Sequence, residues 1–209
     1  MPLTDTGLVP SRTARVLEII RHAILSGELP PGTALVEQEL AAQLGVSKTP
    51  VRESLKTLEG SGLVVMVPYR GATVRELTHA DAAAIYDLRL LLEPEAVRRS
   101  VAAGADLSGA VECLRRAGAA TGRAERSMAN REFHRMLYAG CGNTLLVDTL
   151  DGLRDRTALV SAASWAKSAT WEAEATEHEA ILAAAEAGDA EAARRLTAEH
   201  VAGFRDRLP

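Results

Sequence analysis

Three of the chain's five histidines lie where their imidazole rings could converge on a metal ion. His134, His178 and His200 each fall on the apolar stripe of a separate expected helix, so all three should face the interior of one bundle. Each could instead be an isolated core histidine bonded to a carbonyl. Three such residues on three separate helices are, however, better explained by a shared site than by coincidence. Convergent imidazoles are a preferred site for divalent cations. The pattern therefore predicts a metal site, with zinc favoured and nickel or manganese as alternatives.

Arg89 is a candidate for binding an anionic ligand. It lies beside an expected inward stripe that includes Leu88 and Leu92. A surface ion pair with Glu93, four residues further on, would account for it without any function. Alternatively, its planar guanidinium could hold the carboxylate of a small organic acid. Arg154 is a weaker candidate for binding the same carboxylate.

A cationic stripe follows one face of the expected helix at 48–60. Lys48, Arg52 and Lys56 are spaced by four residues, and Thr49 lies beside them. The opposite face is apolar and should pack on a core. Any solvated helix face can carry such charges, but a stripe led by the helix N-terminus suits insertion into the major groove of DNA.

The elements around this stripe indicate a winged helix-turn-helix. Gly45 should end a short helix, and Ser47 can cap the next one, where Pro50 is tolerated in the first turn. Two short helices joined by a glycine turn and followed by a hairpin describe that motif. The expected elements are a helix from residue 11, a break at 26–32, helices at about 36–44 and 48–60, and strands at 63–67 and 72–74.

The remainder of the chain should be helical throughout. Apolar residues recur at helical spacing from Thr78 onward, interrupted mainly at glycines. The expected helices are at about 79–102, 107–120, 124–140, 143–162, 170–187 and 189–207. The predicted fold is therefore mainly α: a winged helix-turn-helix domain at 1–76 and an all-α six-helix antiparallel bundle at 77–209, joined by the tight junction Arg75–Leu77.

Composition and charge agree with a cytoplasmic protein that has separate functional halves. No apolar run approaches a membrane span or a signal peptide, and two cysteines do not form a disulfide framework. Residues 1–76 hold 8 Lys/Arg and 8 Asp/Glu, so the net charge of −4 lies entirely in residues 77–209. A neutral first domain can still present a basic face to DNA.

The motifs of the first domain resemble a known family. The runs that carry the resemblance are Ser26–Gly32, Glu39–Ala41, Gly45–Leu55 (GVSKTPVRESL), Leu58–Val64 and Arg70–Val74. Together they cover nearly all of residues 11–76 and resemble the GntR family of bacterial repressors.

The resemblance implies which side chains contact DNA. The family positions that do so fall here on Gln38, Ser47, Lys48 and Arg52. The wing tip, here Arg70-Gly71, reaches the minor groove in the family. Arg is usual where this chain has Lys48, which lacks the bidentate fork to guanine but can contact phosphate. With the cationic stripe, the predicted DNA-binding set is Gln38, Ser47, Lys48, Thr49, Arg52, Lys56, Arg70 and Gly71.

The second half resembles the FadR-type C-terminal domain of the same family, in its shorter, VanR-like version. The carrying runs are Asp87–Ala96, Asn130–His134, Gly142–Leu146, Glu177–Leu182, Gly188-Asp189 and His200. The resemblance implies a metal held by Asn130, His134, His178 and His200. Because Asp is commoner than Asn at the first position, this chain would hold the ion in a neutral shell, with lower affinity and a greater need for an anionic ligand.

These observations predict a homodimeric transcription regulator, most simply a repressor, on a palindromic DNA operator. A small carboxylate would bind between Arg89 and the metal and change operator affinity. Two alternatives stay open at this point. One is a metal-dependent enzyme built on the three histidines, although the His-Glu-x-x-His motif is absent; the other is a C-terminal domain that only dimerises.

Overall fold

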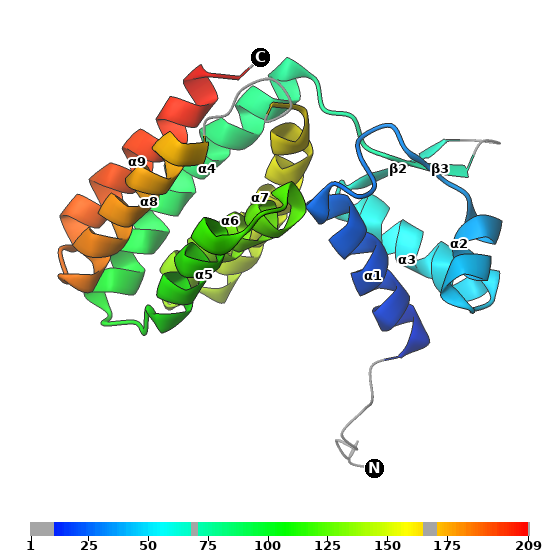
Figure 1. Cartoon of the computed structure of the whole chain (residues 1–209), viewed down its shortest axis with the longest axis horizontal. Helices are drawn as coiled ribbons and strands as arrows, with labels where there is room; N and C mark the ends of the chain where they lie inside the picture. Colours follow the sequence, from blue (N-terminus) through cyan, green and yellow to red (C-terminus); the bar gives the residue numbers. More distant parts are fainter. Residues whose placement is uncertain (1–10, 68–70, 165–170, 209) are drawn as a thin grey trace, which may run out of the picture. The chain divides into compact units, whose positions relative to one another are not determined.

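A computed structural model describes residues 11–67, 71–164 and 171–208 and divides the chain into two compact units (Figure 1). The first unit comprises Met1–Ile24 and Glu28–Glu76. The second comprises Leu77–Pro209 and the short segment Leu25–Gly27. Among the described residues, no helix is both long and apolar enough to cross a membrane.

The first unit is a winged helix-turn-helix. Its helices and strands are α1 (Arg12–Ser26), β1 (Ala34–Leu35), α2 (Glu37–Leu44), α3 (Lys48–Gly60), β2 (Val64–Val67) and β3 (Gly71–Val74). The strands form an antiparallel sheet in the order β1-β3-β2. The hairpin of β2 and β3 was predicted, whereas β1 was not, because a two-residue strand leaves no periodicity in the sequence.

Local signals explain where these helices start and stop. The Ser11 hydroxyl accepts a hydrogen bond from the Ala14 amide (3.1 Å) and caps α1. Gly45 ends α2 in the left-handed region (φ 64°), which glycine adopts without a steric penalty. The prediction for Ser47 was wrong in part: it occupies the N-cap position of α3, but its side chain makes no capping hydrogen bond.

The described residues of the second unit form a bundle of six helices, as predicted. They are α4 (His79–Ala102), α5 (Ser108–Ala119), α6 (Arg123–Tyr138), α7 (Thr144–Ser164), α8 (Trp171–Glu186) and α9 (Ala190–Asp206). Helix α4 packs against α9, α7 and α6, while α5 packs against α6 and α8, and α8 packs against α9 (Figure 1). The largest side chains of the main core are Phe133, Leu137, Tyr138, Leu150 and Ile181.

Helix α4 supplies the buried polar side chains on which the site depends. A capping box with Thr78 and Asp81 fixes its start. The prediction that Leu88 faces inward was wrong, since 47% of it is exposed, whereas Arg89 and Glu93 are almost fully buried. The buried face of α4 is therefore rotated by about one residue from the expected one, and it carries charge into the bundle.

Candidate functional site

The three predicted histidines meet inside the bundle. Nε2 of His178, on α8, lies 3.2 Å from Nε2 of His134, on α6, and 3.2 Å from Nε2 of His200, on α9. All three residues are buried, and their nitrogen atoms lie within 4.8 Å of one another. A proton on His178 could form only one of these two contacts. The rest of the cluster brings nitrogen lone pairs together, which favours a cation among them.

Carboxylates behind two of the rings set this orientation. Nδ1 of His134 lies 2.7 Å from Oε1 of Glu93, and Nδ1 of His200 donates to Oε2 of Glu177 at 2.6 Å. An ionised carboxylate can only accept, so Nδ1 of His200 carries the proton and its Nε2 presents a lone pair. The close approach of the Glu93 carboxylate to Nδ1 of His134 favours the same tautomer there, although this contact does not have hydrogen-bond geometry. Carboxylates that hold histidines in this way typify metal sites.

Burial keeps the rings of His134 and His178 neutral. It lowers the pKa of His134 well below 6.5, and the charge of Arg154 lowers it further. Burial likewise lowers the pKa of His178, and the neighbouring His134 adds to the shift. Neutral imidazole is the form that binds metal, so His134 and His178 are in a ligating state at neutral pH.

Asn130 faces the cluster from one turn before His134 on α6. Its Oδ1 atom is buried, and no described residue donates a hydrogen bond to it. A buried carbonyl oxygen without a partner is costly, so a cation or a donor from a ligand would stabilise it. The four ligands implied by the family resemblance therefore fit a metal ion.

Both predicted arginines lie beside the cluster. Arg89 donates from Nε to Oε2 of Glu93 at 2.9 Å, and Nη1 of Arg154 lies 3.5 Å from Oε1 of the same carboxylate. A surface ion pair with Glu93 was one of the two accounts of Arg89 that the sequence left open; the pair forms, but it is buried. Burial, followed by the charge of Arg89, lowers the pKa of Arg154 to about 10, which leaves it protonated at neutral pH.

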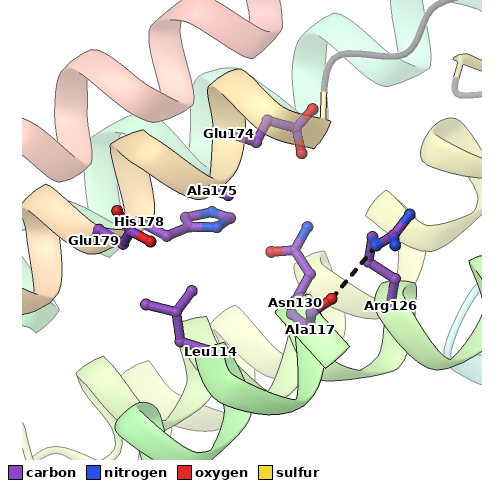
Figure 2. Close-up of a pocket in the computed structure, with 9 residues that line it drawn as sticks. Leu114, Ala117, Arg126, Asn130, Glu174, Ala175, His178 and Glu179 are labelled. Carbon is purple, nitrogen blue, oxygen red and sulfur yellow. Dashed lines mark hydrogen bonds between the residues drawn. The ribbon is translucent and has the colours of Figure 1, made fainter. Parts of the chain in front are cut away.

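Two pockets adjoin these groups. The inner pocket, with an empty volume of about 280 Å³, is lined by Tyr86, Arg89, Asn130, His134, Arg154, Thr157, Glu174, His200, Val201 and Phe204. The outer pocket, of about 500 Å³, lies among α5, α6 and α8 and is lined by His178 on its inner side. Figure 2 shows the outer pocket with Asn130 and His178 directed into it. Asn130 and Glu174 line both pockets and so form the wall between them.

Sequence reasoning missed three carboxylates of this site. Glu93 was considered only as a partner for Arg89, and neither Glu177 nor Glu174 was singled out. Glu177 immediately precedes a predicted ligand, and Glu174 lies one helical turn before it. Those positions were the available signal, but the partner of Glu177 is His200 on α9, and pairing between helices is not visible in the sequence.

The predicted DNA-binding residues that the structure describes lie on the surface of the first unit. All of them are exposed: Gln38 on α2, Ser47, Lys48, Thr49, Arg52 and Lys56 on or beside α3, and Gly71 at the start of β3. Arg70 lies outside the described residues. On α3, Val51, Leu55 and Leu58 are buried on the opposite face, as the apolar periodicity predicted.

The two leading cations of the stripe are bonded to α2. Arg52 donates to Glu37 through Nε (3.0 Å) and Nη2 (2.8 Å), and Nζ of Lys48 donates to Oε1 of Gln38 at 3.1 Å. The hydrogen bond from Arg52 lowers the pKa of Glu37, which therefore stays ionised. Lys56 instead pairs with Glu53 on its own helix at 3.2 Å. Sequence reasoning did not identify Glu37.

Comparison with known proteins agrees with both units. Residues 12–74 match the family model "Bacterial regulatory proteins, gntR family", and residues 84–203 match the FCD domain. The probable D-xylose utilization operon transcriptional repressor of Paenarthrobacter nicotinovorans is 30% identical over 197 residues, which are 91% of this chain and 86% of that protein. The HTH-type transcriptional regulator McbR of Escherichia coli is 30% identical over 95% of this chain and 93% of its own.

Solved structures give the same result. The structure of E. coli McbR/YncC covers 96% of this chain and 98% of its own, with a TM-score of 0.86 and 27% identity. A putative transcriptional regulator GntR from Rhodococcus sp. RHA1 covers 94% of this chain and 97% of its own, with a TM-score of 0.83 and 27% identity. The family consists of transcription regulators and not of enzymes. The chain belongs to the GntR family of DNA-binding transcription regulators, with an FCD domain as its C-terminal half.

Proposed function

We propose that the protein is a repressor whose operator affinity is set by a small organic acid bound together with a divalent metal ion in the inner pocket. The observation that carries this proposal is the convergence of three buried Nε2 atoms beside two buried arginines. The three imidazole nitrogens suit a metal ion, and the two adjacent guanidinium groups suit a carboxylate. A repressor acts at the chromosome, so we expect a cytoplasmic protein.

Two of the nitrogen–nitrogen distances in the cluster suit zinc. Two nitrogens that both ligate zinc at about 2.0–2.1 Å with tetrahedral angles stand about 3.3 Å apart. The two Nε2 contacts of His178 measure 3.2 Å each. His134, His178, His200 and Asn130 would hold the ion, which would supply positive charge to an anionic ligand. Glu93 and Glu177 would offset the charge that Asn130 does not provide.

The inner pocket favours an anion once a metal is present. Arg89 and Arg154 outnumber the carboxylate of Glu93 by one positive charge, and Glu174, which also lines the pocket, returns the balance to zero. A divalent ion would make the pocket positive. The carboxylate of the acid would then bind between the metal and the guanidinium groups, where charge-assisted hydrogen bonds are strong.

A homodimer would place two α3 helices on a palindromic operator. One face of α4 supports a partner surface, because Leu88 is 47% and Leu91 73% exposed, and the two lie three residues apart. Neighbouring exposed leucines on one helix face form an apolar surface that contact with another chain would cover. The second chain we propose is another copy of this protein.

Native mass spectrometry of the purified protein tests the metal and the dimer together. We expect a dimer with about one divalent ion per chain, and loss of that ion in the variant His178→Ala. The control is His79→Ala, at the start of α4, where the histidine is exposed and lies outside the cluster. Full metal content in His178→Ala, or equal loss in both variants, would refute the site.

A further inference from the structure

The recognition-helix arginine is held by a carboxylate from the neighbouring helix. Glu37 and Arg52 are fifteen residues apart, and three hydrogen-bond contacts join them: Nε to Oε1 (3.0 Å), Nε to Oε2 (3.2 Å) and Nη2 to Oε2 (2.8 Å). The Arg52 side chain is 55% exposed and that of Glu37 is 22% exposed. Because exposed ion pairs contribute little to folding stability, the pair calls for another explanation.

The geometry of the pair leaves the base-reading side of the guanidinium open. Glu37 occupies the side formed by Nε and Nη2. Of the three remaining donors, one on Nη1 and one on Nη2 are parallel and form the end of the group, while the second donor on Nη1 points away from Glu37. Two parallel donors match O6 and N7 of guanine, the commonest specific contact of arginine in the major groove. Glu37 can therefore stay bonded while Arg52 reads a base.

The pair should also weaken the binding of Arg52 to DNA phosphates. A free arginine binds phosphates of any sequence through its charge. With the Glu37 carboxylate 2.8 Å away, that charge is largely neutralised, and the side chain is fixed in one direction. Lys48 is held in a similar way by the amide of Gln38, but without charge neutralisation.

We propose that Glu37 is a specificity-determining residue, which positions Arg52 for one base pair and suppresses its binding to phosphates. Glu37 would thus lower the affinity of the protein for DNA of any sequence and raise its discrimination between base pairs. This role requires only the DNA binding of the family, and neither the metal nor the acid enters it.

The test compares Glu37→Gln with Glu39→Gln in the full-length protein. Glu39 is exposed on the same helix, so both variants remove one negative charge from α2. The probe is a duplex selected by the wild-type protein from a random pool, with a scrambled duplex and single-base-pair variants beside it. Fluorescence anisotropy gives each affinity, and thermal unfolding verifies that both variants fold.

We expect Glu37→Gln to bind the scrambled duplex a few-fold more tightly and to lose about ten-fold in discrimination at one base pair of each half-site, as loss of a well-placed bidentate contact predicts. Glu39→Gln should raise all affinities alike and leave the discrimination unchanged. In the background of Arg52→Ala, replacing Glu37 should have no further effect on discrimination.

Two results would overturn the role of Glu37. Discrimination that is unchanged in Glu37→Gln would make the ion pair incidental. If Glu37→Gln bound the selected duplex more tightly than the wild type does, with unchanged discrimination, Glu37 would only weaken DNA binding by Arg52 and would not position it.

Discussion

Glu93 connects the two chemical halves of the inner pocket through its two oxygen atoms. Oε2 accepts from Arg89, and Oε1 lies 2.7 Å from Nδ1 of His134. Burial alone would raise the pKa of this carboxyl, but Arg89 and Arg154 outweigh it and hold the pKa well below its usual range. The residue is therefore a buried anion whose charge depends on its partners.

Arg89→Ala should consequently destabilise the whole domain. It would leave Glu93 charged in the interior, and breaking a buried pair in this way costs about 3–5 kcal/mol. Arg89→Lys retains the positive charge but lacks the planar fork. We expect Arg89→Lys to fold, to bind operator DNA as the wild type does, and to lose most of its response to small carboxylic acids.

Urea denaturation and operator binding, measured with a panel of mono- and dicarboxylic acids, check both variants. Arg98→Lys is the control, since Arg98 lies on the same helix and pairs with Glu95 near the surface. An undiminished acid response in Arg89→Lys would show that Arg89 serves only to balance Glu93.

At the residue scale, the sequence was sufficient for side chains whose position depends on their own helix. The three histidines lie on apolar stripes, so their inward direction and their convergence could be predicted. Glu93 and Glu177 act on rings of other helices, and Glu37 acts on a residue of the next helix. Such roles require the packing of helices, which periodicity alone does not determine.

At the scale of helices and strands, periodicity and glycine breaks predicted the helices to within a few residues. Residues 48–60 and 79–102 were predicted with their observed bounds, because caps and glycines mark both ends. The inward face of α4 was predicted wrongly at Leu88, since apolar residues surround this helix on several sides. The buried face includes the Arg89–Glu93 pair, which a hydrophobic pattern cannot reveal.

The turn after α6 gives a prediction on packing. A Cβ atom at Gly140 would lie 2.4 Å from Cβ of Ala105 and 2.9 Å from Oγ of Ser100. Since a Cβ atom cannot rotate away, Gly140→Ala must move the segment that follows α4, at a cost of about 1–3 kcal/mol in the free energy of unfolding.

Gly152→Ala is the matched control for that substitution. Gly152 lies inside α7, and nothing lies within 4 Å of an added Cβ. Higher helix propensity should therefore stabilise this variant by about 0.5–1 kcal/mol. Urea denaturation of both variants measures the difference, and equal effects would show that the contact at Ala105 relaxes freely.

At the scale of the whole molecule, the proposed dimer makes a prediction about α4. Leu88→Glu combined with Leu91→Glu places two charges on the exposed leucine face. If a second copy covers that face, the double variant should sediment as a monomer at micromolar concentration and lose most of its affinity for a palindromic operator.

Val111→Glu controls for a charge on any exposed apolar residue, because Val111 is 42% exposed on α5. This variant should remain a dimer and bind the operator normally. Dimers of unchanged stability in the α4 double variant would place the subunit contact elsewhere.

The single carboxylate of Glu93 would make the response of the proposed regulator to an acid depend on the bound metal. Its two oxygens contact one group that would hold the metal and one that would hold the acid, so each occupant changes the surroundings of the other. Linkage requires that this influence be reciprocal. The protein would then work as a coincidence detector, in which an acid is registered only while metal is bound. A cell starved of the metal would keep the regulated genes in the same state as a cell that lacks the acid.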